Sequence, residues 1–259
     1  MSCSQSDKKT VNVIFLHHST GKRVWKGNPN RIIYRISKTG DVERWLNKYN
    51  RKYKANIKVD HMDFPKKEPY GWKNYPFDYY NIWVKHAGKE PYMKEPTLEI
   101  LTEKYDIIIW KHCYPVSNIL DESDYLPDID SDVKTVSNYK LQYNALKKKM
   151  LSFPQTKFIV WTPPPLAESK TNPDEAKRTK SFYEWMINLW DEKNDNIFIW
   201  DYYMLAAEGE LYLKTEYATG INDSHPNKVF AGKASRLFAN RIIQVMEGTA
   251  DDKDMKGID

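Results

Sequence analysis

The chain lacks the features that mark several classes of protein. It has two cysteines, Cys3 and Cys113, in 259 residues, and this number does not indicate a disulfide framework. No apolar run approaches the ~18 residues that a membrane-spanning helix needs, so we expect no transmembrane segment. The 40 basic and 35 acidic residues are spread along the chain. Because nucleic-acid-binding proteins usually gather Lys and Arg on one face, we expect no nucleic-acid partner.

The first residues leave the cellular compartment undetermined. Residues 1–10 are polar, predict a disordered start and lack the apolar core of a signal peptide. A cysteine followed by a short polar tether is also how a processed lipid-anchored protein begins, and Cys3 fits that pattern. An exported or lipid-anchored protein and a cytoplasmic one therefore both remain possible, and the oligomeric state is equally undetermined.

Apolar, strand-like segments alternate with amphipathic, helix-like segments over residues 11–247. The strand-like segments begin at Val11 or span residues 57–62, 105–111, 157–161 and 196–201. The helix-like segments span residues 41–49, 97–103, 133–152, 173–193 and 228–247. No Gly/Ser linker or internal repeat divides them. The pattern predicts one three-layer α/β/α sandwich around a mostly parallel five-stranded sheet.

Two segments fall outside this alternation. Residues 64–96 contain five prolines and many aromatic residues without a steady period, which indicates a long insertion. The aromatic residues between Tyr70 and Tyr92 could stack on sugar rings, but we favour an ordinary insertion packed over the rim of the sheet. Residues 248–259 are charged and predict a disordered tail.

A serine follows the first strand, at the place where α/β folds bind their ligands. Ser19 is a candidate nucleophile because a hydroxyl becomes reactive when a nearby base takes its proton. His225 is the best candidate base, since it lies in a loop before the last helix and beside a carboxylate. Asp223 or Asn222 could orient its ring, and only Asp223 could also stabilise the charged imidazolium.

An acyl-transfer site also needs donors for the oxyanion that forms during attack. The side-chain amide of Asn118, in the polar cluster after the strand at 105–111, is one candidate. The backbone N–H groups of Ser19 and Gly71 are others. The sequence thus predicts that three distant segments, 17–21, 112–118 and 222–225, meet at one edge of the sheet.

The order of these residues resembles the SGNH/GDSL hydrolase family. The resemblance rests on Ser19 after the first strand, Asn118 after a middle strand, and Asp223 and His225 before the last helix, and covers residues 11–247. It implies a flavodoxin-like fold, with Ser19 as nucleophile, His225 as base and Asn118 in the oxyanion site. It also implies a small-molecule or carbohydrate ester as substrate, acetyl esters included, and requires no cofactor or metal.

The chain departs from the family pattern at three places. His17 and His18 stand where the family has Gly-Asp, and His18 is a candidate structural replacement for that Asp. The family's acid lies three residues before its histidine, a position held here by Asn222. The second-block glycine has no clear counterpart beyond Gly71. The replacement of the family's acid by Asn222 favours the alternative hypothesis, a non-catalytic module of the same fold that binds a glycan or another ligand.

Simpler interpretations exist for the individual residues. Ser19 could cap the helix that follows the first strand, and Asn118 could cap a turn. His17 and His18 point to opposite faces of a strand, so one of them is expected to be a core or supporting histidine.

Two other kinds of site are weaker. A metal site could use His17 or His18 with His225 and the acids and histidine of residues 60–63, but no tight ligand spacing supports it. Ser19–Lys22 resembles the end of a phosphate-binding loop, yet Leu16 stands where that motif needs glycine. Simple anion binding by backbone N–H groups after the first strand remains compatible with the sequence.

Overall fold

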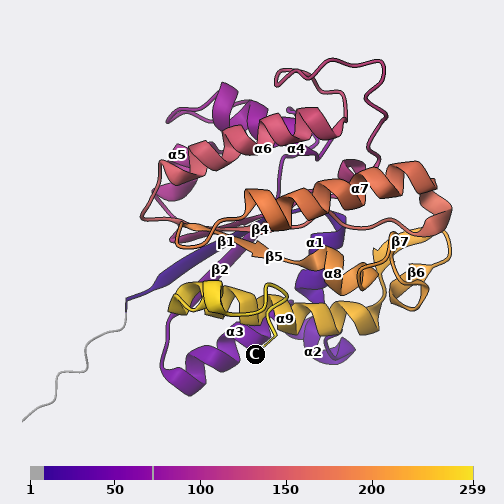
Figure 1. Ribbon diagram of the computed structural model, residues 1–259. Coiled ribbons are helices and arrows are strands. Elements are labelled where there is room, and N and C mark those ends of the chain that lie inside the picture. Colours follow the sequence, from indigo (N-terminus) through magenta and orange to yellow (C-terminus); the bar gives the residue numbers. More distant parts are fainter. Residues whose placement is uncertain (1–8, 72, 259) are drawn as a thin grey trace, which may run out of the picture.

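The computed structural model describes residues 9–71 and 73–258 and contains one parallel five-stranded sheet. The strands have the order β2-β1-β3-β4-β5, which is the flavodoxin-like order. Helices cover both faces of the sheet (Figure 1). The predicted fold class is therefore confirmed. The strands are β1 (Val11–His17), β2 (Ile57–Asp63), β3 (Ile107–Trp110), β4 (Lys157–Trp161) and β5 (Ile197–Trp200).

Successive side chains of β1 alternate between two separate apolar cores on the two faces of the sheet. Val13 and Phe15 belong to one apolar cluster, whereas Ile14 and Leu16 belong to the other, as the period of two in a strand requires. The first cluster lies under α1 (Ser19–Lys26), α3 (Asp41–Tyr53), α8 (Tyr202–Ala207) and α9 (Lys228–Glu247). The second lies under α4 (Pro76–Tyr80), α5 (Leu98–Thr102), α6 (Val136–Leu151) and α7 (Pro173–Trp185), which continues as a π-helical turn to Trp190.

The strand order places the end of β1 beside the end of β3. The chain leaves β1 for β2 on one side and returns to β3 on the other side. Ligands of open α/β sheets bind at such a switch point, outside the carboxyl ends of the strands. The residues that follow β1 and β3 are therefore the first place to look for chemistry.

The insertion at 64–96 is packed against the sheet. Its rings include Tyr75, Tyr79 and Trp83, all buried in the second core. Asn74 is also buried: its Nδ2 donates to the Phe64 carbonyl at 3.1 Å, and its Oδ1 accepts from the Cys113 N–H. Among the described residues of 70–92, no large apolar side chain is exposed, which favours the interpretation of an insertion packed against the sheet.

Several elements lie where the sequence predicts loops. They are α1, α2 (Arg31–Ser37), α8 and the antiparallel hairpin of β6 (Ala218–Gly220) and β7 (Asp223–Pro226). Each is shorter than the window over which apolar periodicity can be recognised. β7 bears directly on function, because it holds both Asp223 and His225 next to α9.

The described end of the chain corrects the prediction of a disordered tail at 248–259. The Asp201 N–H donates to the Met255 carbonyl at 3.0 Å, and Trp200 Nε1 donates to the Lys256 carbonyl at 3.0 Å. The charged side chains of this end segment face solvent, while its backbone carbonyls accept hydrogen bonds from residues at the end of β5. The predicted disorder of the start falls mostly on residues 1–8, outside the described residues. Among the described residues, no helix has the length and apolar character to cross a membrane.

Candidate active site

Ser19 is the first residue of α1, directly beyond the end of β1. The capping position is held by His18, and no side chain makes the capping hydrogen bond. Ser19 Oγ lies 2.9 Å from Cys113 Sγ, on the segment that follows β3. The interpretation of Ser19 as a helix cap is therefore wrong, and its hydroxyl is held at the β1/β3 switch point.

Asp223 orients His225. His225 Nδ1 lies 2.5 Å from Asp223 Oδ1, and the His225 backbone N–H donates to the same oxygen at 2.9 Å. Burial raises the pKa of Asp223, but the hydrogen bonds from His225 outweigh it and the pKa is lowered overall. An ionised Asp223 accepts the Nδ1 proton, which leaves Nε2 as the basic nitrogen. Asn222 is exposed in the turn before β7, so it is Asp223 that contacts the ring.

Ser19 and His225 line one cavity of about 410 Å³, which also includes His61, Trp25 and Gly40. Two residues far apart in the sequence therefore line the same cavity. In the described residues, however, the Ser19 hydroxyl is bonded to Cys113 and not to His225. A hydrogen bond between Ser19 and His225 would therefore require the Ser19 hydroxyl to leave Cys113. Catalytic hydrogen bonds are often long or absent before substrate binds.

Cys113 is the site residue that sequence reasoning missed. Burial raises the pKa of its thiol, but the charge of Lys111, the Ser19 hydroxyl and the N–H groups of Thr20 and Tyr114 together lower it. Lys111 is buried, and its Nζ has no hydrogen-bond partner among the described residues. The sequence did contain a signal for Cys113, namely its closeness to the end of a strand. Cys113 comes three residues after the end of β3, whereas Asn118 comes eight residues after it.

Tyr114 and Arg23 support the histidine from two sides. The Tyr114 ring packs edge-on against the His225 ring, with centroids 4.9 Å apart, and its hydroxyl donates to the Ser224 carbonyl. Arg23 Nη2 lies 3.8 Å from Asp223 Oδ2, and Nη1 donates to Thr219 Oγ1 at 2.9 Å. These contacts tie α1 to the β6–β7 hairpin and so fix the position of His225 relative to Ser19.

The predicted oxyanion donors differ in their distance from the candidate nucleophile and in whether they are free to bind. Asn118 is half-buried after the helical turn Tyr114–Ser117 and does not line the cavity. Gly71 is exposed, and its N–H already donates to the Lys67 carbonyl at 2.6 Å. The Ser19 N–H stands at the first position of α1, where helical N–H groups have no acceptor within the helix. Of the predicted donors, it is the one next to the candidate nucleophile.

His17 and His18, at the end of β1, are buried, and burial favours their uncharged forms. His18 Nε2 bonds to the Pro65 carbonyl at 2.6 Å, and burial lowers the pKa of His18. His17 stacks on His61, and burial together with the nearby charges lowers its pKa to about 2. Both rings therefore connect the first strand to its neighbours. Among the described residues, no group of three or more His, Cys, Asp or Glu side chains is arranged to hold a metal ion.

Comparisons with known proteins add little to this geometry. No family model and no curated protein matches the chain. Among solved structures, LAE5, an alpha/beta hydrolase enzyme from the metagenome of Lake Arreo, Spain, is similar at 10% identity and a TM-score of 0.49. That match covers 92% of this chain and 96% of LAE5. A second solved chain reaches 11% identity and a TM-score of 0.44, covering 94% and 98%. At this level of likeness, function must be argued from the chain's own residues.

Proposed function

We propose that the protein is a serine-dependent hydrolase of ester bonds, with Ser19 as nucleophile, His225 as base and Asp223 as the residue that orients it. The observation that carries the proposal is the shared cavity: Ser19 and a carboxylate-bonded His225 line the same space at the switch point of the sheet. Both are the residue types that acyl transfer through a covalent intermediate needs.

In the proposed reaction, Ser19 Oγ attacks the acyl carbonyl and forms an ester bond to the enzyme. His225 Nε2 takes the serine proton and then donates it to the departing alcohol. Water, deprotonated by His225, next attacks the acyl-enzyme and releases the acid. Base catalysis of this kind contributes about 10²–10⁴-fold. The Ser19 N–H supports the oxyanion, whereas Asn118 does not line the cavity and the Gly71 N–H already donates to the Lys67 carbonyl.

The substrate class follows from the family resemblance and from the size of the site. Small acyl esters, including acetyl groups on carbohydrate, are the substrates that the resemblance implies. A cavity of about 410 Å³ falls within the usual range for small-molecule sites. The chain's own residues specify no particular acyl group.

One observation favours the alternative of a ligand-binding module without catalysis. The Ser19 hydroxyl is bonded to Cys113, which withholds it from His225 in the resting structure. If the Ser19–Cys113 hydrogen bond persists when a ligand is bound, the protein binds the ligand in this cavity but does not hydrolyse it.

Labelling with a fluorophosphonate, followed by mass spectrometry of the modified peptide, separates the two functions. A hydrolase gives one adduct on Ser19, absent in Ser19→Ala and slowed in His225→Ala. Thr10→Ala, just before β1 and at the opposite end of that strand from Ser19, serves as the control and labels at the rate of the native protein. A folded sample that remains unlabelled, or labels equally in His225→Ala, would contradict the proposed mechanism.

A further inference from the structure

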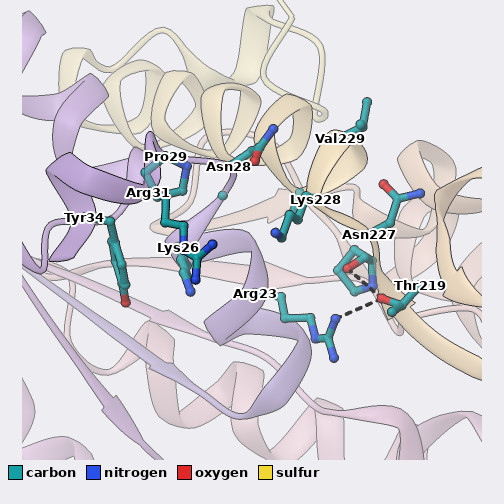
Figure 2. A pocket seen from close by; sticks show the side chains of 13 residues that line it. Arg23, Lys26, Asn28, Pro29, Arg31, Tyr34, Thr219, Asn227, Lys228 and Val229 are labelled. Atoms are coloured by element: carbon teal, nitrogen blue, oxygen red, sulfur yellow. Dashed lines mark hydrogen bonds between the residues drawn. The ribbon is translucent and has the colours of Figure 1, made fainter.

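A second, larger cavity adjoins the candidate active site. It has a volume of about 940 Å³ and shares Arg23, Lys26 and Tyr34 with the cavity that contains Ser19 and His225. Figure 2 shows its lining, which comes from α1, α2, the β6–β7 hairpin and the start of α9. The two cavities together therefore extend from the candidate nucleophile along α1 to the N-terminus of α9.

The lining of both cavities is strongly basic. Six cationic side chains line one or both of them: Lys22, Arg23, Lys26, Arg31, Lys38 and Lys228. No Asp or Glu is among the described residues that line either cavity. Of the six, Arg23 alone forms an ion pair with a described carboxylate, Asp223 at 3.8 Å. The nearby Asp41 is occupied in accepting the Asn28 N–H at 2.7 Å.

The N-terminus of the longest described helix faces the same space. Asn227 caps α9 by accepting the Phe230 N–H at 2.9 Å, and Asn227, Lys228 and Val229 line the larger cavity. The first N–H groups of a helix lack partners within it and carry a partial positive charge, a combination that binds phosphate groups. Side-chain and backbone charge thus point to the same kind of ligand.

We propose that the substrate carries a phosphoryl group, or a comparable multiply charged oxyanion, which binds in this basic cavity while its ester bond lies at Ser19. This inference rests on the proposed function and names the substrate class for it. The six cations are exposed, but they gather around a cavity that adjoins the candidate site and whose described lining contains no Asp or Glu.

Helix geometry sets the separation of the two groups. Ser19, Arg23 and Lys26 lie at positions i, i+4 and i+7 on one face of α1. At 1.5 Å per residue, Arg23 lies about 6 Å and Lys26 about 10 Å along the axis from Ser19. We therefore expect the charged group to be separated from the scissile carbonyl by a spacer of several bonds, not attached to it directly.

Anion binding can be measured independently of hydrolysis. Titration calorimetry with inorganic pyrophosphate should give saturable binding that weakens with added NaCl, because salt screens exposed charges. The double variant Lys26→Gln/Arg31→Gln should bind about tenfold more weakly. Lys104→Gln removes an exposed cation from a distant turn and should bind as the native protein does. Sulfate and citrate, titrated in parallel, distinguish a phosphoryl site from one for other anions.

Hydrolysis of acetate esters with and without a phosphate group then tests whether the substrate is charged and how far the charge lies from the ester bond. Acetate release is compared for hexyl acetate and for acetoxyalkyl phosphates with two, four or six methylene groups between ester and phosphate. We expect kcat/KM to be at least about tenfold higher for a phosphate with one of the longer spacers than for hexyl acetate, and this preference to fall in Lys26→Gln/Arg31→Gln.

The outcomes separate the two proposals. If the protein hydrolyses hexyl acetate but does not bind pyrophosphate, the anion site is overturned and the esterase proposal stands. The same holds if Lys104→Gln weakens pyrophosphate binding as much as Lys26→Gln/Arg31→Gln does. Selective pyrophosphate binding without hydrolysis of any ester overturns the esterase and the assignment of the anion to its substrate. Citrate binding in preference to pyrophosphate overturns the phosphoryl assignment.

Discussion

Replacement of Asp223 by Asn tests the most specific contact in the candidate site. The substitution keeps the size of the side chain but removes the negative charge 2.5 Å from His225 Nδ1. An amide can also donate to Nδ1, which would favour the ring tautomer that lacks a basic Nε2. Both effects weaken His225 as a base without opening a cavity in the core.

The size of the expected loss depends on how far the Asp223 and His225 side chains are exposed to solvent. Unit charges about 4 Å apart interact by about 1 kcal/mol in water and about 4 kcal/mol near a protein surface. The side chains of His225 and Asp223 are 26% and 36% exposed, so solvent screening moves the value toward the lower limit. With 1.36 kcal/mol for each factor of ten, a loss of about 1.4–2.7 kcal/mol corresponds to about ten- to a hundredfold.

The assay is kcat/KM for 4-nitrophenyl acetate, together with the rate of fluorophosphonate labelling. Asp223→Asn should lower both by about ten- to a hundredfold. Asn222→Ala is the matched control, since Asn222 is exposed and precedes β7, and it should change neither. Full activity in Asp223→Asn, or a larger loss in Asn222→Ala, would show that Asp223 does not orient the base.

Three further predictions concern the surroundings of this pair. Cys113→Ala frees the Ser19 hydroxyl from a hydrogen bond of about 1 kcal/mol and should raise the labelling rate about fivefold; slower labelling would mean that Cys113 holds Ser19 in its reactive position. Asn118→Ala should lower kcat less than twofold because Asn118 does not line the cavity, whereas removal of a true oxyanion donor costs about 10²–10³-fold. His17 has a folded-state pKa of about 2 and an ordinary value of 6.5, so its contribution to stability is complete above pH 6.5 and is lost as pH falls. His17→Gln should therefore reduce the pH dependence of the unfolding free energy, measured in urea between pH 4.5 and 6, by about 1.4 kcal/mol per pH unit; an unchanged slope would refute this.

The sheet was predictable because its strands are long apolar runs bounded by polar residues. The strand predicted at 157–161 coincides with β4, and the helix predicted at 228–247 coincides with α9. Strands buried on both faces give near-continuous apolar runs, and α9 adds the Asn227 cap to its amphipathic pattern. At these two elements, local preference and tertiary burial agree.

The short elements around the site were not predictable in the same way. α1 has eight residues, and its buried apolar side chains are Val24 and Trp25; two residues cannot establish a period. β6 and β7 have three and four residues, and Thr219 of β6 accepts a hydrogen bond from Arg23, which is distant in the sequence. Their structure comes from packing against the sheet and α9, which the local sequence does not encode.

The position of the acid illustrates how such a short element changes the reading of a motif. In a strand, residues i and i+2 point to the same face. Because β7 spans Asp223–Pro226, the acid that can reach His225 on the same face is two residues before it, and Asp223 meets that requirement. A residue three positions before, Asn222, falls in the turn outside the strand. A spacing of two residues between acid and histidine is therefore what a strand at this position requires, and Asn222 at the position three before His225 does not prevent the Asp223–His225 contact.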